Sequence, residues 1–195
     1  MGQDKANLKN VNVLLGVTGG VAVYKAVDLA SKLASSGAAI RTIMTENACK
    51  FVTPKSFEAV TNSPVYTSMW TGVGEFNIEH INLTEWADII ALVPATASII
   101  GKIANGICDD LLSSVLCACW QKPILIAPAM NTNMWTNPAV QQNIKTLAGR
   151  RIEMIGPEKG RLACGTEGVG RLSEPQDIII RIEQIASKLN RGKGK

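Results

Sequence analysis

The chain has 195 residues, of which 46% are hydrophobic and 18% are charged, with a formal net charge of +4. This composition is typical of a folded globular protein and excludes a disordered one, and the length suits one α/β domain. No apolar run reaches the roughly 18–20 residues that cross a bilayer, and the polar start MGQDKANLKN lacks the apolar core of a signal peptide. We therefore expect a cytoplasmic protein that does not bind membranes.

The positive charge gathers toward the C-terminus, and basic residues are not interleaved with aromatic ones, so we expect a solvated tail and no nucleic-acid binding. Five cysteines without a Cys-x-x-Cys pair, together with a single histidine, argue against a structural zinc site or any other metal. Cys49, Cys108, Cys117 and Cys119 have apolar neighbours and are expected to be reduced core residues. Cys164 differs because glycines surround it.

Strand and helix signals alternate in chain order. Short apolar runs predict buried strands at residues 11–17, 40–44, 87–93, 123–129 and 151–155, and we expect Pro94 to end the third of these. Helices are predicted from residue 23 to a stop near Gly37, around 54–60, over 97–119, over 138–147 and from 175 onward. The helical stretch over 97–119 is expected to break near Gly106, with Asp109 as the cap of its second piece.

Buried strands separated by helices predict an α/β fold with a parallel sheet covered on both faces. No linker or repeat indicates a second domain, so we expect one domain over residues 11–190. Residues 1–10 would form a polar extension and residues 191–195 a basic tail. Ligands in such sheets bind beyond the carboxyl ends of the strands, where the strand order reverses.

Two motifs at predicted strand ends could bind a phosphate. Gly19 and Gly20, followed by Val21, lie between the first strand and the first helix, where backbone N–H groups and the helix dipole favour an anion. Thr45 and Asn47 follow the second strand and could serve the same phosphate or simply cap the next helix. The third glycine of a dinucleotide fingerprint is absent, so a mononucleotide fits better.

Two further motifs follow the third and fourth predicted strands. Pro94 and the small residues of 95–98 make an open turn that could hold a flat ring. The segment PAMNTNMW (128–135) is unlike a solvated turn, and its Asn131 could fix a carboxylate without pairing it to a cation. That suits decarboxylation, which is favoured when the carboxylate is desolvated. A glycine-rich segment, 160–170, is predicted to be a mobile flap.

These motifs carry a resemblance to a known family. The segments GGVAVYK (19–25), PATASIIGKIANGICDDLL (94–112), PAMNTNMW (128–135) and LACGTEGVG (162–170) resemble those of the homo-oligomeric flavin-containing cysteine decarboxylases. The resemblance covers roughly residues 11 to 175. It implies a flavodoxin-like (Rossmann-type) sheet, FMN as cofactor, and homotrimers or higher oligomers such as a dodecamer, with FMN between subunits.

The resemblance also implies roles for individual residues. His80 would act as catalytic base toward the substrate thiol, which suits a side chain that titrates near neutral pH, and Cys164 would donate a proton in the reductive half of the reaction. Substrate would be bound by Met130, Asn131, Ala163 and Gly165. FMN would be bound by Gly19, Gly20, Val21, Thr45, Asn47, Thr96, Ala97, Ser98, Ile99 and Ala129. Residues 96–99 read Thr-Ala-Ser-Ile in this sequence, where the family usually has Ser-Ala-Asn-Thr.

The activity implied is decarboxylation of a phosphorylated cysteine conjugate, (R)-4′-phospho-N-pantothenoylcysteine, to 4′-phosphopantetheine in coenzyme A biosynthesis. Three alternatives stay open. A peptidyl-cysteine oxidative decarboxylase should not need Cys164 or its flap, and a flavin prenyltransferase lacks the PAMNTNMW pattern. A non-catalytic, phosphatase-regulating relative would be an interaction protein, and the presence of His80, Asn131 and Cys164 together argues against it.

Overall fold

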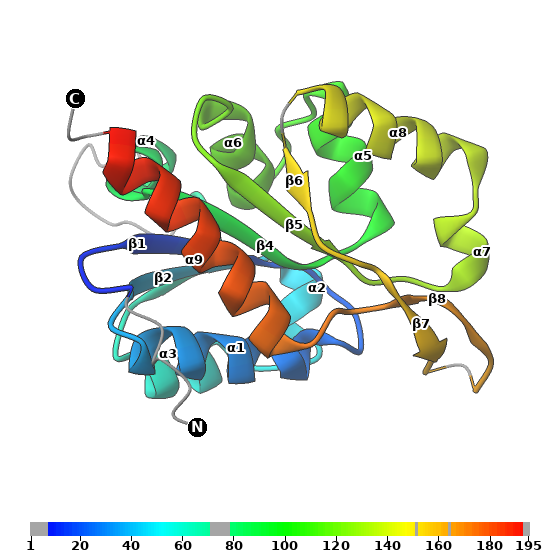
Figure 1. Ribbon diagram of the computed structural model, residues 1–195, viewed down its shortest axis with the longest axis horizontal. Coiled ribbons are helices and arrows are strands. Elements are labelled where there is room, and N and C mark those ends of the chain that lie inside the picture. Colours follow the sequence, from blue (N-terminus) through cyan, green and yellow to red (C-terminus); the bar gives the residue numbers. More distant parts are fainter. Residues whose placement is uncertain (1–7, 71–78, 151, 164, 193–195) are drawn as a thin grey trace.

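A six-stranded sheet forms the centre of the protein, in the order β3-β2-β1-β4-β5-β6 with every neighbouring pair parallel (Figure 1). The computed structural model describes residues 8–70, 79–150, 152–163 and 165–192. The strands of the sheet are β1 Asn12–Val17, β2 Ala39–Met44, β3 Val65–Tyr66, β4 Ile89–Ala95, β5 Ile124–Pro128 and β6 Glu153–Met154. The predicted parallel α/β fold is therefore confirmed.

The strand order places β1 at a topological switch point. The chain leaves β1 to build β2 on one side and later returns to build β4 on the other. Without the two-residue edge strand β3 the order is that of flavodoxins, and with it the order is that of the dinucleotide-binding Rossmann folds. In both, the crevice for ligands opens beyond the carboxyl ends of the strands beside the switch point.

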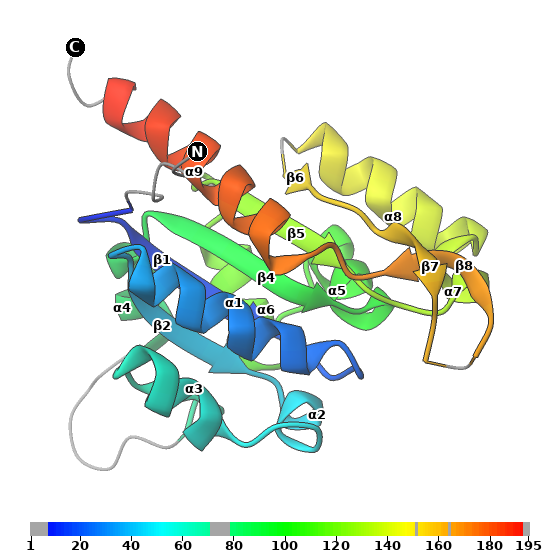
Figure 2. The same ribbon diagram turned by 60° about the horizontal axis from the view of Figure 1, so that its bottom comes forward.

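Helices cover both faces of the sheet (Figures 1 and 2). Three of them pack together on one face: α1 Val23–Ser35, α3 Pro54–Thr61 and α9 Pro175–Gly192. The other face carries α4 Glu79–Trp86, α5 Ala97–Asn105, α6 Leu111–Ala118 and α8 Pro138–Gly149. Two single-turn helices, α2 Glu46–Cys49 and α7 Thr132–Trp135, follow β2 and β5. Within the described ranges no helix is long and apolar enough to cross a membrane.

Alternation along β1 shows why the sheet separates two hydrophobic cores. Val13, Leu15 and Val17 belong to the core under α1 and α9, whereas Leu14 belongs to the core under α5 and α6. Side chains of successive strand residues point to opposite faces, so a strand that is apolar throughout is buried on both sides. Leu8 also lies in the first core, three residues before the predicted domain boundary.

Two local details of the strand β4 and the helices after it differ from the prediction. The strand continues past Pro94 to Ala95, and its pairing with β5 is irregular between Leu92 and Ala95. A bulge tolerates proline because the missing N–H is not needed there. The break after α5 lies at Gly106 as predicted, but Asp110, not Asp109, caps α6 by accepting a hydrogen bond from the Ser113 N–H at 2.7 Å.

The segment predicted as a flap is largely an antiparallel hairpin. Its strands are β7 Glu158–Arg161 and β8 Glu167–Arg171, which project from the body beside α7 (Figure 2). The last predicted strand is therefore followed by two more. These short strands are rich in glycine and charge, with Val169 as their one β-branched residue, so they lack the apolar pattern by which strands are recognised in a sequence.

The expectation that four cysteines lie in the core is wrong for two of them. Cys119 is buried, and this burial raises the pKa of its thiol to about 12. Cys49 is half-buried, but Cys108 and Cys117 are exposed. Cys164 lies outside the described residues.

Candidate functional site

A cavity of about 550 Å³ opens beyond the carboxyl ends of β1, β4 and β5. Its lining brings together segments that lie far apart in the sequence: Gly19, Gly20, Val21, Ala22, Tyr24, Lys25, Pro94, Thr96, Ala129, Met130, Asn131, Met134, Arg161, Leu162, Ala163, Gly170, Arg171 and Leu172. Eight of the residues predicted for cofactor or substrate lie on it: Gly19, Gly20, Val21, Thr96, Ala129, Met130, Asn131 and Ala163.

The loop after β1 forms one wall of the cavity. A Cβ on Gly19 would lie 2.6 Å from the Cβ of Asn47, so only glycine lets this loop pack against α2. No atom of the described residues lies within 4 Å of the Cβ position of Gly20, which leaves the backbone open to the cavity. Among the described residues no side chain caps the N-terminus of α1, and no acidic residue lies in its first turn. Its dipole is therefore available to an anion.

The loops after β2 and β4 are held by their own threonines. Thr45 caps α2 through the Ala48 N–H at 3.2 Å, and Thr96 caps α5 through the Ile99 N–H at 3.4 Å. Thr96 lines the cavity, whereas Thr45 does not. Neither do Asn47, Ala97, Ser98 and Ile99. The capping role of Thr45 explains that residue without a ligand.

A threonine that the sequence analysis did not single out joins two of these loops. Thr18 follows β1 directly and is only 2% exposed. Its hydroxyl donates a hydrogen bond to the Pro94 carbonyl at 2.7 Å and accepts one from the Thr96 N–H at 3.1 Å. The ends of β1 and β4 are thereby held together at the switch point.

The loop after β5 carries Met130 and Asn131. The Asn131 side chain accepts a hydrogen bond from the Asn133 N–H at 2.8 Å and so caps α7. The Met130 N–H donates to the Gly170 carbonyl at 3.0 Å, which joins this loop to the hairpin. A Cβ on Gly170 would collide with the Met130 carbonyl oxygen. The backbones of the loop and the hairpin thus pack directly on each other.

The hairpin contributes the outer rim of the cavity through Arg161, Leu162 and Ala163. Gly165 lies near the tip and does not line the cavity, and Cys164 lies outside the described residues. His80 lies in the first turn of α4, but its side chain is likewise outside the described part. The two predicted catalytic side chains are therefore known here by their places in the chain alone.

Charged residues at the cavity form a network that the sequence analysis missed. Lys25 pairs with Glu174 at 2.9 Å, and Arg171 pairs with Glu158 at 2.7 Å. The bond from Lys25 holds the pKa of Glu174 below its ordinary value. Lys25 belongs to the GGVAVYK motif and lies four residues after Val21. That spacing could have indicated that Lys25 lies on the same side as Val21, which was predicted to bind FMN.

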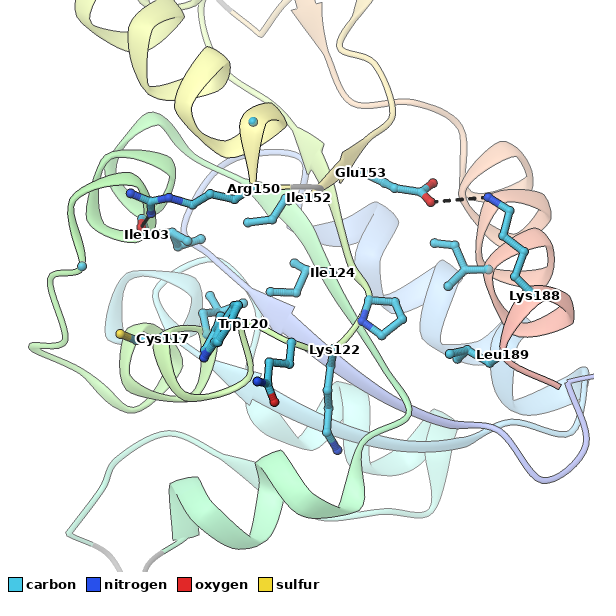
Figure 3. A pocket seen from close by; sticks show the side chains of 16 residues that line it. Ile103, Cys117, Trp120, Lys122, Ile124, Arg150, Ile152, Glu153, Lys188 and Leu189 are labelled. Carbon is cyan, nitrogen blue, oxygen red and sulfur yellow. Dashed lines mark hydrogen bonds and ion pairs between the residues drawn. The ribbon is translucent and has the colours of Figure 1, made fainter. Parts of the chain in front are cut away.

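A second and larger cavity, of about 1020 Å³, lies at the opposite ends of the strands, where β5 and β6 begin (Figure 3). Ile124 and Ile152 lie at its centre, with Trp120 on one side and Leu189 on the other. Of the predicted site residues whose side chains the structure describes, none lines it. Ligands in parallel sheets bind beyond the carboxyl ends of the strands, and the smaller cavity lies there. We therefore take the smaller cavity as the candidate functional site.

The residues of the smaller cavity fit a flavin mononucleotide. An open glycine backbone at a helix N-terminus suits a phosphate. Pro94, Ala129 and Met130 add apolar surface to the walls, which suits a flat aromatic ring.

Comparisons with known proteins identify the family of this chain. A family model described as Flavoprotein matches residues 1–187. The chain is 49% identical over 172 residues to the coenzyme A biosynthesis bifunctional protein CoaBC of Bacillus subtilis (strain 168), which covers 88% of this chain and 42% of that protein. The chain therefore spans less than half the length of this relative.

Two solved structures have the same fold. A mutant of PPC decarboxylase complexed with pantothenoylaminoethenethiol superposes with a TM-score of 0.85 at 33% identity, covering 92% of this chain and 100% of that one. The FMN binding protein AtHal3 superposes with a TM-score of 0.81, also at 33% identity, covering 92% and 98%. With a family model that spans nearly the whole sequence, and with relatives that share its fold, the chain belongs to the flavoprotein family.

Proposed function

We propose that this chain binds FMN and decarboxylates (R)-4′-phospho-N-pantothenoylcysteine to 4′-phosphopantetheine, a step of coenzyme A biosynthesis in the cytoplasm. The observation that carries the proposal is the cavity in which the Gly19–Gly20 loop, the Thr96 turn, the Met130–Asn131 loop and the hairpin meet. Its support is the 49% identity to a coenzyme A biosynthesis protein and the fold shared with PPC decarboxylase.

The cofactor would be held by the two inner loops. Gly19, Gly20 and the N-terminus of α1 would bind the phosphate, and Thr96 and Ala129 would lie against the ring. Bound FMN supplies a two-electron acceptor that can return the electrons later, so the overall reaction has no net redox change. Thr45, Asn47, Ala97, Ser98 and Ile99 remain weaker candidates because they do not line the cavity.

The substrate would lie between the Met130–Asn131 loop and the hairpin. The Asn131 carboxamide would bind the substrate carboxylate without supplying a full positive charge, which leaves the carboxylate free to depart as CO₂. His80 would take the thiol proton, and Cys164 would return a proton to the decarboxylated product while Ala163 and Gly165 cover it.

A second copy of the chain would complete the site. Val21, Tyr24 and Met134 line the cavity, yet 59%, 61% and 47% of their respective surfaces are exposed. Apolar side chains of this size at the rim of a site favour burial against a partner. We therefore include a homotrimer, or a larger assembly built from trimers, in the proposal, and light scattering of the purified protein measures it.

The visible spectrum of the purified protein is the first test. We expect flavin absorbance that mass spectrometry assigns to FMN, and poor binding of FAD. Anaerobic incubation with the phosphorylated cysteine conjugate should then release CO₂ and yield the saturated thiol. A colourless protein that also fails to bind added FMN would refute the proposal. Release of an unsaturated enethiol from peptide substrates alone would instead favour a peptidyl-cysteine decarboxylase.

A further inference from the structure

Thr18 occupies a position that the proposed chemistry does not explain. It is buried at 2% exposure between two loops, and it is not among the residues that line the cavity. Its neighbours do line it: Gly19 on one side, and Pro94 and Thr96 across the sheet. Whatever Thr18 does for a ligand, it does through these neighbours.

The hydroxyl of Thr18 makes two hydrogen bonds, one as donor and one as acceptor, to residues 76 and 78 positions away in the sequence. It donates to the Pro94 carbonyl at 2.7 Å and accepts from the Thr96 N–H at 3.1 Å. One side chain thus fixes the distance between the glycine loop after β1 and the turn after β4. A second bond, from the Thr45 N–H to the Val17 carbonyl at 3.0 Å, fixes the loop after β2 to the same strand end.

We propose that Thr18 is a positioning residue whose hydroxyl sets the spacing between the phosphate-binding glycine loop and the ring-binding Thr96 turn, and thereby the affinity for FMN. The inference rests on the proposed flavin site. A ligand that touches both loops gains from a spacing fixed in advance, because less ordering is left to occur on binding. A ligand that touches only one loop gains little from it.

The substitution Thr18→Val separates shape from hydrogen bonding. Valine has nearly the same shape as threonine, but it leaves the Pro94 carbonyl and the Thr96 N–H without their buried partner. Those groups can then be satisfied only if the loops separate or water enters between them. Thr18→Ser keeps the hydroxyl and should restore the spacing.

The protein supplies a matched control in Thr42 on β2. Thr42 is 1% exposed, and its hydroxyl has no hydrogen-bond partner among the described residues. Thr42→Val therefore makes the same chemical change in the same sheet without breaking a bond between loops. It should bind FMN like the parent and should be at least as stable.

The experiment is a titration of the flavin-free full-length chain with FMN and, separately, with riboflavin, following quenching of flavin fluorescence. We expect Thr18→Val to weaken FMN binding roughly tenfold, the factor that corresponds to about one net hydrogen bond. The affinity for riboflavin, which lacks the phosphate, should fall much less. The ratio of the FMN affinity to the riboflavin affinity should therefore decrease. Thr18→Ser and Thr42→Val should keep the ratio of the parent.

Two results would overturn the inference: equal FMN affinity of folded Thr18→Val and the parent, or equal losses for FMN and riboflavin. Circular dichroism and thermal melting of the flavin-free variants report whether each is folded during the titration. If the valine variant does not fold, Thr18→Cys, which lacks the γ-methyl group and has only a weak donor, takes its place and is judged by the same ratio. A parent protein that binds neither flavin would refute the proposed function instead.

Discussion

At the scale of single residues, Asn131 has two duties that can be separated. Its side chain oxygen caps α7 through the Asn133 N–H, and its amide lies at the cavity where we place the substrate carboxylate. Aspartate caps helices as well as asparagine does, so a change to aspartate preserves the helix while it adds a negative charge to the site.

We predict that Asn131→Asp folds normally but binds the carboxylate substrate at least about tenfold more weakly, because two carboxylates would repel each other. Isothermal titration with substrate measures the loss. The control is Asn137→Asp, since Asn137 caps α8 by the same bond, to the Ala139 N–H at 2.9 Å, away from the cavity. Equal substrate affinity of the two variants would remove Asn131 from the site.

His80 gives a second prediction at this scale. His80→Asn should keep FMN bound, because the substitution does not change the glycine loop proposed to bind the phosphate, and should lower the decarboxylation rate by about two to four orders of magnitude, as loss of a catalytic base does. The visible spectrum of the variant checks that FMN is bound. Carbon dioxide release under single-turnover conditions measures the decarboxylation rate. Normal CO₂ release by the variant would contradict the assigned role.

Residue motifs were predictable where local chemistry alone was unusual. The paired glycines at 19 and 20 and the Asn131 segment stood out because ordinary turns do not need them, and the structure brings them to one cavity. Thr18 and Lys25 did not stand out, because their significance comes from partners 76 and 149 residues away. A single sequence carries no signal of such pairings.

At the scale of elements, the hairpin β7–β8 depends on glycine at its base. Gly170→Ala would place a Cβ against the Met130 carbonyl, in a residue whose φ of 151° is itself unfavourable for a side chain. We predict that this variant weakens substrate binding more than FMN binding, because the hairpin forms the outer part of the cavity. Equilibrium titrations with each ligand give the two affinities.

Gly149→Ala serves as the control for this prediction. Gly149 ends α8, has no atom of the described residues within 4 Å of its Cβ position and does not line the smaller cavity. Both ligand affinities should stay at parent values, since alanine fits a helix without strain. Retention of substrate binding by Gly170→Ala would show that the hairpin is not needed to bind the substrate.

The elements that could be predicted from the sequence are those with a clear hydrophobic pattern. The buried strands β1, β2, β4 and β5 appeared as apolar runs, and α1 and α9 as helices with regular starts. The short strands β3, β7 and β8 and the helix α4 did not appear. They are stabilised by what they pack against rather than by their own composition, and a single sequence does not contain that information.

At the scale of the whole molecule, the stability of the fold depends on pH through a cluster of ion pairs at the turn between two helices. Lys102 pairs with Asp109 at 2.7 Å and with Asp110 at 2.8 Å, where α5 turns into α6. Burial alone would raise the pKa of Asp110, but hydrogen bonds from Lys102 and Ser113 outweigh it, so its pKa lies below the ordinary value.

A lowered carboxyl pKa fixes the direction of a pH effect. The stabilisation is complete above the ordinary aspartate value of about 4 and is lost as the pH falls through the lower folded-state value. We predict that the melting temperature falls on acidification from about pH 5 to pH 3, and falls less in Asp110→Asn, which keeps the cap but cannot titrate. Asp28→Asn, in an exposed pair on α1, should leave the slope unchanged.

The close contact between β8 and the loop after β5 has a consequence for recombining this protein with its relatives. A Cβ on Gly168 would collide with the Thr132 hydroxyl, as one on Gly170 would with Met130, so the two segments fit as a matched pair. A hairpin grafted from a relative should function only if residues 130–132 are transplanted with it. The pair is therefore the natural unit of exchange for altering the substrate specificity that we propose for this site.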